Sequence, residues 1–308
     1  MTRNFILGGR KAVFLFFVAA SAFLAVSCGS THKSAAVRKD AQIRIGTYNL
    51  WRSDIGKDEY AWDVRKHILA RSVVDNAFDV FAAEEVDTTM FRELPALVKK
   101  AGGRYEWLTF SPYDPDGKGS MKAQAIVFRS DRFKVLEFHH FWCSETPDRM
   151  STGWDEGKFK RGACCAILRE KGSGRKIFVM ASHFPLGKEA RLHFAPIVIE
   201  RAMQYNPEGL PSFFIGDLNT RENRPESEIL RTYWTDAFRT VPAQRRVGPA
   251  GSFNNHNVGA DMQKAPRIDF VYYRGEGISP ERYVTNDAKY DGIYPSDHCP
   301  VYVDFTIK

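Results

Sequence analysis

Residues 211–219 read Pro-Ser-Phe-Phe-Ile-Gly-Asp-Leu-Asn, an apolar run that stops at a glycine followed by two polar side chains. The run over 211–215 is short and bounded by turn-forming residues, which predicts a buried strand. Asp217 and Asn219 then stand at the end of that strand. Packed α/β folds place polar functional groups at strand ends. This stretch therefore predicts a sheet-based core with a functional site beside it.

Strands and helices interleave on both sides of this stretch. Apolar residues at helical spacing predict helices over 61–76, 88–101 and 188–204, with Pro196 expected to kink the last one. The other periodic runs predict strands over 42–50, 79–83, 123–129, 133–141, 163–169, 177–183, 268–273 and 301–307. The chain has no internal repeat and no second core-sized block. We therefore expect one α/β domain over residues 41–308.

The first thirty residues have the layout of a secretory signal peptide. Three basic residues precede an apolar run over 12–26, which is short for a membrane-spanning helix. The stretch Leu-Ala-Val-Ser-Cys-Gly over 24–29 resembles the lipobox of bacterial lipoproteins. We predict a signal peptide over 1–27, a lipid on Cys28 and a tether over 28–40, so that the exported protein is anchored to a membrane of a bacterial cell envelope. A plain cleaved signal peptide and an uncleaved anchor are the alternatives.

The composition is that of a globular protein. Of the 308 residues, 44% are hydrophobic and 26% are charged. The formal net charge is +7, and three of the positive charges lie in the predicted signal peptide. The remaining excess does not indicate a nucleic-acid binder, but it is compatible with an anionic substrate. The cysteines after Cys28 have neither disulfide-framework nor zinc spacing, so we expect small buried thiols.

Six motifs, all in the same order, resemble those of the endonuclease/exonuclease/phosphatase family, also called deoxyribonuclease I-like. They are Gly46-Thr47-Tyr48-Asn49-Leu50, Asp79-Val80-Phe81 leading to Glu84-Glu85-Val86, Ser182-His183, Gly216-Asp217-Leu218-Asn219, Arg267-Ile268-Asp269-Phe270-Val271 and Ser296-Asp297-His298-Cys299-Pro300-Val301. The resemblance runs from about Ile43 to the C-terminus. It implies a four-layer α/β/β/α sandwich, with two packed mixed β-sheets flanked by helices. Further stretches are similar to a secreted bacterial branch of the family.

The resemblance also implies a metal site. Glu85 would hold the metal, with Asn49 and Asp297 nearby. Hard oxygen ligands of this kind suit Mg²⁺ or Mn²⁺. A phosphodiester repels hydroxide at neutral pH, so a catalyst has to neutralise the phosphate and generate a nucleophile. Whether the site takes one ion or two stays open at this stage.

The same resemblance implies roles for five further residues. Asp217 would deprotonate the attacking water, and Asn219 would hold that water or a phosphate oxygen. His298 would donate to the phosphoryl oxygen, and Asp269 would fix the tautomer of His298. His183 would contact the phosphate or act as general acid. Outside the motifs, Arg65, Arg161 and Arg191 are candidates for phosphate clamps or for structural pairing.

Three departures from the family pattern weaken one of these roles. Glu84 stands where the family has glutamine, Lys122 stands where it often has the glutamate that pairs with His183, and Pro185 replaces an acidic residue. Lysine cannot accept a hydrogen bond from an imidazolium. We hypothesise that Lys122 and Glu84 form a compensating ion pair. The role of His183 as an acid is then the least secure of the set.

These observations predict a monomeric, metal-dependent phosphoesterase. Its substrate would be an anionic phosphoester, either nucleic acid or a small molecule, and the sequence does not choose between them. The alternative is a non-catalytic binding module on the cell surface that keeps the fold, which the changes at Glu84 and Lys122 motivate. The loop over 112–119 would either cover the cleft or form a plain surface turn.

Overall fold

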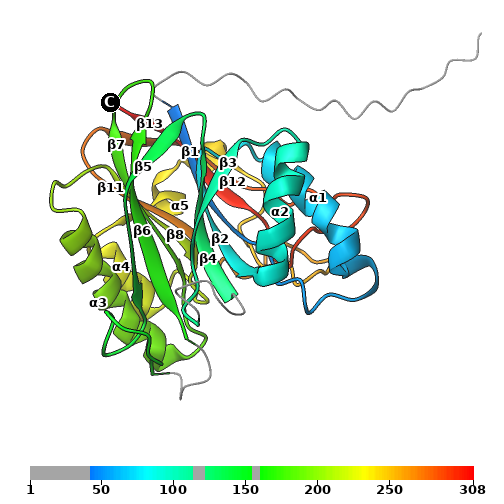
Figure 1. The fold of residues 1–308 in the computed structure, drawn as a ribbon, viewed down its shortest axis with the longest axis horizontal. Coiled ribbons are helices and arrows are strands. Elements are labelled where there is room, and N and C mark those ends of the chain that lie inside the picture. The colour runs from blue at the N-terminus through cyan, green and yellow to red at the C-terminus, as the bar shows by residue number, and fades with distance from the viewer. Residues whose placement is uncertain (1–41, 114–121, 155–159) are drawn as a thin grey trace, which may run out of the picture. The chain divides into compact units, whose positions relative to one another are not determined.

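The computed structural model describes residues 42–113, 122–154 and 160–308, and of Lys122 only the backbone. These residues belong to one compact unit (Figure 1). The predicted signal peptide, Cys28 and the tether lie outside the described residues, so they remain predictions. Among the helices described, none has both the length and the apolar character needed to cross a membrane.

Two β-sheets form the centre of the fold. The strand order of the first is β10 (Arg246–Val247), β12 (Ile278–Thr285), β13 (Val301–Ile307), β1 (Gln42–Asn49), β2 (Val80–Asp87), β4 (Lys122–Arg129) and β3 (Tyr105–Phe110). The order of the second is β5 (Phe133–Trp142), β6 (Gly162–Glu170), β7 (Lys176–His183), β8 (Ser212–Asp217), β11 (Asp269–Arg274) and β9 (Thr235–Asp236). Both sheets are mixed, because each combines parallel and antiparallel pairs.

Each sheet contains one parallel pair joined by a long helix. In the first sheet, β1 and β2 are parallel and α1 (Trp62–Asp75) connects them. In the second sheet, β7 and β8 are parallel and α3 (Lys188–Tyr205) connects them. A parallel pair needs such a crossover, which returns the chain to the same edge of the sheet. The carboxyl ends of β1 and β2, and those of β7 and β8, therefore lie together.

The helices cover the outer faces of the two sheets (Figure 1). Those beside the first sheet are α1 and α2 (Thr88–Lys100), and those beside the second are α3 and α4 (Pro225–Arg231). The remaining helices are short: α5 (Ala237–Thr240), η1 (Asp58–Tyr60) and η2 (Ala243–Arg245). The predicted four-layer sandwich is confirmed.

Three apolar cores hold the layers together. The core between the sheets includes Ile45 of β1 and Val179 of β7. Next to α1 and α2 lies a second core, with Leu69 and Phe81, and next to α3 and α4 a third, with Phe194 and others. Fully burying a side chain of this size contributes about 1.5–3 kcal/mol. Alternate residues of a strand serve the two faces, as expected for sheets covered on both sides.

The sequence pattern did not predict β3, β12 or α4. In β3 the side chains are mostly half-buried, because it is the last strand of its sheet, and this weakens its alternation. β12 contains Pro280, and its register with β13 shifts between Pro280 and Arg282. Proline cannot donate to a β-ladder, so it argues against a strand in a sequence-only assignment.

Candidate active site

The polar residues at the strand ends meet at one edge of the sandwich. In the first sheet Asn49 ends β1 and pairs with Glu84 of β2. In the second sheet His183 ends β7, and Asp217 at the end of β8 pairs with Asp269 at the start of antiparallel β11. The parallel and antiparallel strands thus bring their functional ends to the same edge. Asn49 and Asp217, 168 positions apart in the chain, contact each other there.

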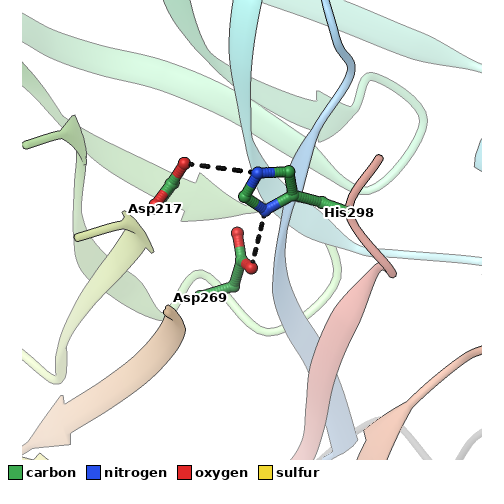
Figure 2. Close-up of side chains that lie close together, drawn as sticks. All are labelled: Asp217, Asp269 and His298. Atoms are coloured by element: carbon green, nitrogen blue, oxygen red, sulfur yellow. Dashed lines mark hydrogen bonds and ion pairs between the residues drawn. The ribbon is translucent and has the colours of Figure 1, made fainter. Parts of the chain in front are cut away.

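Asp217, Asp269 and His298 form the centre of this site (Figure 2). His298 lies between the two carboxylates: its Nδ1 is 2.8 Å from Asp269 Oδ2, and its Nε2 is 3.7 Å from Asp217 Oδ2. All three side chains are buried. Their potential ligand atoms lie within 4.8 Å of one another, close enough to hold a metal ion. The Nδ1 contact matches the carboxylate–imidazole pair expected for Asp269.

The charges of these groups depend on one another. Burial raises the pKa of Asp217 to about 7, although the positive charge of His298 lowers it and Asp269 raises it further. Burial alone would lower the pKa of His298, but the carboxylates of Asp269 and Asp217 raise it well above the usual value. His298 is therefore an imidazolium at neutral pH, and Asp217 is close to the point at which it exchanges its proton.

Asp217 is the meeting point of the two sheets. Its Oδ2 accepts a hydrogen bond from Asn49 Nδ2 at 3.1 Å and lies 3.4 Å from His183 Nε2. Its Oδ1 accepts a hydrogen bond from the Asn219 amide at 2.9 Å. Asn219 has a positive φ of 48° and donates its side-chain amide to Phe184 O at 2.9 Å. The turn after β8 thus fixes the orientation of the Asp217 carboxylate.

His183 is held differently from His298. It is buried, its backbone amide donates to Gln124 Oε1 at 3.1 Å, and its Nε2 faces Asp217. Burial lowers the pKa of His183 well below its usual value, and the positive charges of Arg161 and His298 add to this effect. His183 is therefore neutral at physiological pH. A neutral imidazole can contact a phosphate as a hydrogen-bond donor, but it carries no extra proton to give.

A β-bulge separates the two neighbouring glutamates of β2. The register of β2 against β4 shifts between Ala83 and Val86, and Glu85 has a positive φ of 59°. Bulges of this kind redirect a side chain, and a positive φ in a non-glycine residue costs on the order of 1–3 kcal/mol. As a result Glu85 lines an open cleft, whereas Glu84 is fully buried.

The buried carboxyl group of Glu84 is protonated and therefore uncharged. The Thr47 hydroxyl lies 3.0 and 3.1 Å from the two oxygens of its carboxyl group. Burial raises the pKa of Glu84 well above its usual value, and the charges of Asp269 and Asp217 raise it further. A protonated side chain at this position resembles a glutamine in shape and charge. The Lys122 side chain lies outside the described residues, so its pairing with Glu84 remains a hypothesis.

Asn49 pairs across the sheet with Glu84, the neighbour of Glu85, and Asp297 is near enough to Glu85 for their charges to interact. Asn49 Oδ1 accepts a hydrogen bond from the Trp51 amide at 3.0 Å. Burial raises the pKa of Asp297 to about 6, with His298 lowering it and the charge of Glu85 raising it. Two interacting carboxyl groups, together with an amide oxygen on the neighbouring strand, are the oxygen donors that suit a hard divalent cation.

The cleft beside these residues is lined by cationic, aromatic and amide side chains. The described residues of its lining are Arg52, Glu85, Pro112, Tyr113, Ala123, Gln124, Lys160, Arg161 and His183. Pro112 and Tyr113 therefore do contribute to the cleft. Residues 114–119 of the same predicted loop lie outside the described residues.

The three candidate arginine clamps have different surroundings. Arg65 is buried and donates to the carbonyls of Leu50, Arg52 and Pro295. Arg191 Nε donates to buried Glu226 at 2.8 Å. These contacts are structural, whereas Arg161 lines the cleft.

A loop that carried no motif in the sequence analysis holds the site in place. Buried Ser252 accepts hydrogen bonds through Oγ from the Ile268 and Asp269 amides, at 3.0 and 3.2 Å. Its carbonyl accepts from the Cys299 amide at 2.7 Å. The next residue, Phe253, places its ring edge-on to His298, 5.0 Å between centroids. The loop thus ties Asp269 to His298, but its sequence, Ser-Phe-Asn-Asn, shows no periodic pattern that could have indicated this role.

The chain is similar to several known proteins, of which three are described. A structure of a mannosyl-6-phosphatase from Bacteroides thetaiotaomicron VPI-5482 is 26% identical, with a TM-score of 0.75, and the match covers 85% of this chain and 99% of that one. Another structure from Bacteroides thetaiotaomicron, of an endonuclease/exonuclease/phosphatase family protein, is 24% identical, with a TM-score of 0.77 and coverage of 87% and 98%. The Ccr4 exoribonuclease subunit of the Candida albicans CCR4-Not complex is 22% identical, and the match covers 80% of this chain but only 38% of that protein.

The sequence pattern of one family matches most of the chain. Residues 46–298 fit the Endonuclease/Exonuclease/phosphatase family. That interval includes the convergent residues from Asn49 to His298. Members of the family are divalent-metal-dependent enzymes that hydrolyse phosphoester bonds. This protein is a member of the endonuclease/exonuclease/phosphatase family and a hydrolase acting on ester bonds.

Proposed function

We propose that the protein is a Mg²⁺- or Mn²⁺-dependent phosphoesterase, exported and anchored to a bacterial membrane through Cys28. One observation carries the catalytic part of this proposal. A single buried carboxylate with a pKa of about 7, Asp217, lies 3.7 Å from the imidazolium of His298. A base that exchanges its proton near neutral pH beside a fixed cationic donor suits acid–base catalysis at a phosphate.

Each residue of the site has its own role in the reaction. Asp217, oriented by Asn49 and Asn219, accepts a proton from the attacking water. The water oxygen forms a bond to phosphorus as the bond from phosphorus to the alcohol oxygen breaks. The alcohol oxygen then takes up a proton from solvent, and Asp217 returns its proton to solvent. His298, held by Asp269, donates a hydrogen bond to the phosphoryl oxygen as its negative charge grows. His183 is a neutral donor to the phosphate.

Glu85, Asn49 and Asp297 would hold the divalent cation. Bound there, the cation would supply positive charge that neutralises the phosphate and favours ionisation of water. The Asp217–Asp269–His298 group is a less suitable site, because His298 already uses Nδ1 for Asp269 and its positive charge would repel a cation.

The substrate is a phosphoester, and two classes are in question. The mannosyl-6-phosphatase favours a small phosphoester, and the Ccr4 exoribonuclease favours nucleic acid. The test uses the protein with Mg²⁺ or Mn²⁺ on p-nitrophenyl phosphate, bis-p-nitrophenyl phosphate and plasmid DNA. We expect hydrolysis of at least one, lost on Asp217→Ala or His298→Ala and kept in Asp287→Asn, which changes an exposed acid.

Absence of turnover with any divalent metal, together with tight phosphoester binding, would favour the non-catalytic binding module.

The lipid anchor on Cys28 is tested separately. Cells expressing the full chain should incorporate labelled fatty acid into the protein, and Cys28→Ala should abolish the labelling and release the protein from membranes. A Cys28→Ala protein that is still labelled would contradict lipidation at this residue.

A further inference from the structure

Cationic side chains gather at one point of the cleft. Arg52 follows β1, and Lys160 and Arg161 precede β6, yet all three line the same cleft as His183 and Glu85. Among the described residues that line this cleft, Glu85 is the only acid. The Arg52 guanidinium is paired with Asp54 at 2.8 Å, so among the described lining residues Lys160 and Arg161 supply the further positive charge.

Lys160 is held in place by its backbone and by an aromatic ring. Its amide donates to the Tyr113 hydroxyl at 3.0 Å, and its Nζ lies 5.4 Å from the centroid of the Tyr113 ring. The Tyr113 segment is fixed in turn, because Trp142 Nε1 donates to the Pro112 carbonyl at 3.0 Å. Within the described part of the chain, Lys160 forms no ion pair. Lys160 lines the cleft, so its positive charge acts on a ligand bound there.

Arg161 and Arg52 lie next to the reacting groups. The charge of Arg161 contributes to the lowered pKa of His183, whose Nε2 is 3.4 Å from Asp217. Gln124 fixes this relation, because it donates to the Gly162 carbonyl at 2.8 Å and accepts from the His183 amide at 3.1 Å. The Arg52 amide lies 3.4 Å from Glu85 Oε2. The positive charge of Arg161 therefore acts at the reacting groups, whereas Arg52 contacts Glu85 only through its backbone.

The number of negative charges on that phosphate decides what these cations favour. A phosphodiester carries one negative charge, whereas a phosphomonoester with a second pKa near 6 carries close to two at neutral pH. Additional cations beside the phosphorus therefore attract the monoester, with its two charges, more strongly than the diester. A binding site for nucleic acid would instead distribute its cations along the path of successive phosphates, often with stacking aromatic rings.

We propose that Lys160 and Arg161 form a subsite that selects the dianionic phosphate of a small phosphomonoester over a phosphodiester. This proposal rests on the phosphoesterase function proposed above and names its substrate class. The reaction is balanced: ROPO₃²⁻ and H₂O give ROH and HPO₄²⁻. The water oxygen bonds to phosphorus, the electron pair of the broken P–O bond stays on the leaving oxygen, and one water proton ends on each product.

The experiment compares two substrates with the same leaving group. In wild-type protein with Mg²⁺, p-nitrophenyl phosphate should be hydrolysed with a higher kcat/KM than bis-p-nitrophenyl phosphate. Lys160→Met and Arg161→Met should each lower kcat/KM for the monoester at least about tenfold, which corresponds to the loss of one charge-assisted contact. The diester value should change less than about threefold. Lys134→Met, at an exposed lysine of β5, is the matched control.

The possible results separate the proposed subsite from the proposed phosphoesterase function. Equal losses on both substrates, or a wild-type preference for the diester, would overturn the subsite while leaving the phosphoesterase function intact. Failure of the wild type on every substrate would instead reject the proposed function. A selective loss of plasmid cleavage would show that these cations bind nucleic acid. If Arg161→Met does not fold, as judged by its Tm, Lys160→Met alone decides the question, because its exchange leaves the backbone bond to Tyr113 in place.

Discussion

Asp217 is buried, and its environment favours the protonated form of its carboxyl group. Its pKa of about 7 in the folded protein lies above the ordinary value of an unfolded chain, near 4. Between these two values the folded state binds a proton that the unfolded state does not. Raising the pH through this range therefore lowers the free energy of unfolding.

This linkage gives a prediction for the metal-free protein. Between pH 4 and pH 8, in the presence of a chelator, Asp217→Asn should lose less unfolding free energy than wild type, by on the order of 2–4 kcal/mol. Urea unfolding at several pH values measures the difference. Asp287→Asn, at an exposed position, should follow the wild-type curve. Parallel curves for wild type and Asp217→Asn would show that Asp217 is not a buried acid with a raised pKa.

Ser252 should matter for both stability and rate. Ser252→Ala leaves the buried amide of Asp269 and the partly buried amide of Ile268 without their acceptor, and an unsatisfied buried group costs about 1–3 kcal/mol. We expect a lower unfolding free energy and, because Asp269 positions His298, a lower kcat at unchanged KM. Ser279→Ala, at an exposed serine of β12, should change neither. A normal kcat in a destabilised Ser252→Ala protein would mean that the loop supports the fold without positioning the site.

At the level of elements, the strand ends could be predicted, but their local geometry could not. The Gly216–Asn219 stretch and the end of β7 were recognisable because polar groups follow apolar runs. The β2 bulge was not: the family resemblance assigns Glu85 to the metal, but nothing in the Glu84-Glu85 pair itself indicates the register shift that buries Glu84. That shift depends on the pairing of β2 with β4, which brings together residues far apart in the sequence. The role of Ser252 could not be predicted for a similar reason, because its hydrogen-bond partners, Ile268, Asp269 and Cys299, lie in other segments of the chain.

The parallel pair of β7 and β8 depends on a glycine. A Cβ at Gly216 would lie 1.9 Å from the Ser182 carbonyl oxygen, and the residue has a φ of 152°. Gly216→Ala should therefore separate the two strands whose ends carry His183 and Asp217. We expect a loss of at least about 2 kcal/mol of stability, measured by urea unfolding, and a lower kcat. Gly172→Ala, in an open turn with no atom near the added Cβ, is the control. Equal stabilities of the two variants would contradict the close packing at Gly216.

At the level of the molecule, the sandwich is what makes the site. The first sheet contributes Asn49 and Glu85, the second contributes His183, Asp217 and Asp269, and neither sheet alone holds a complete set. The six ordered motifs predicted this fold and the members of the site. They could not predict the charges, because these follow from burial: Glu84 and His183 are neutral, and His298 is positive.

The central claim is that this edge of the sandwich hydrolyses phosphoesters with a cation held at Glu85. A Mg²⁺ titration of hydrolysis by chelator-treated protein tests it most directly, with wild type, Glu85→Gln and the exposed-site control Glu106→Gln compared. We predict no activity before Mg²⁺ is added, a half-activating concentration at least about tenfold higher in Glu85→Gln, and wild-type behaviour in Glu106→Gln. Full activity of the chelated wild type, or the same half-activating concentration in Glu85→Gln, would contradict the claim.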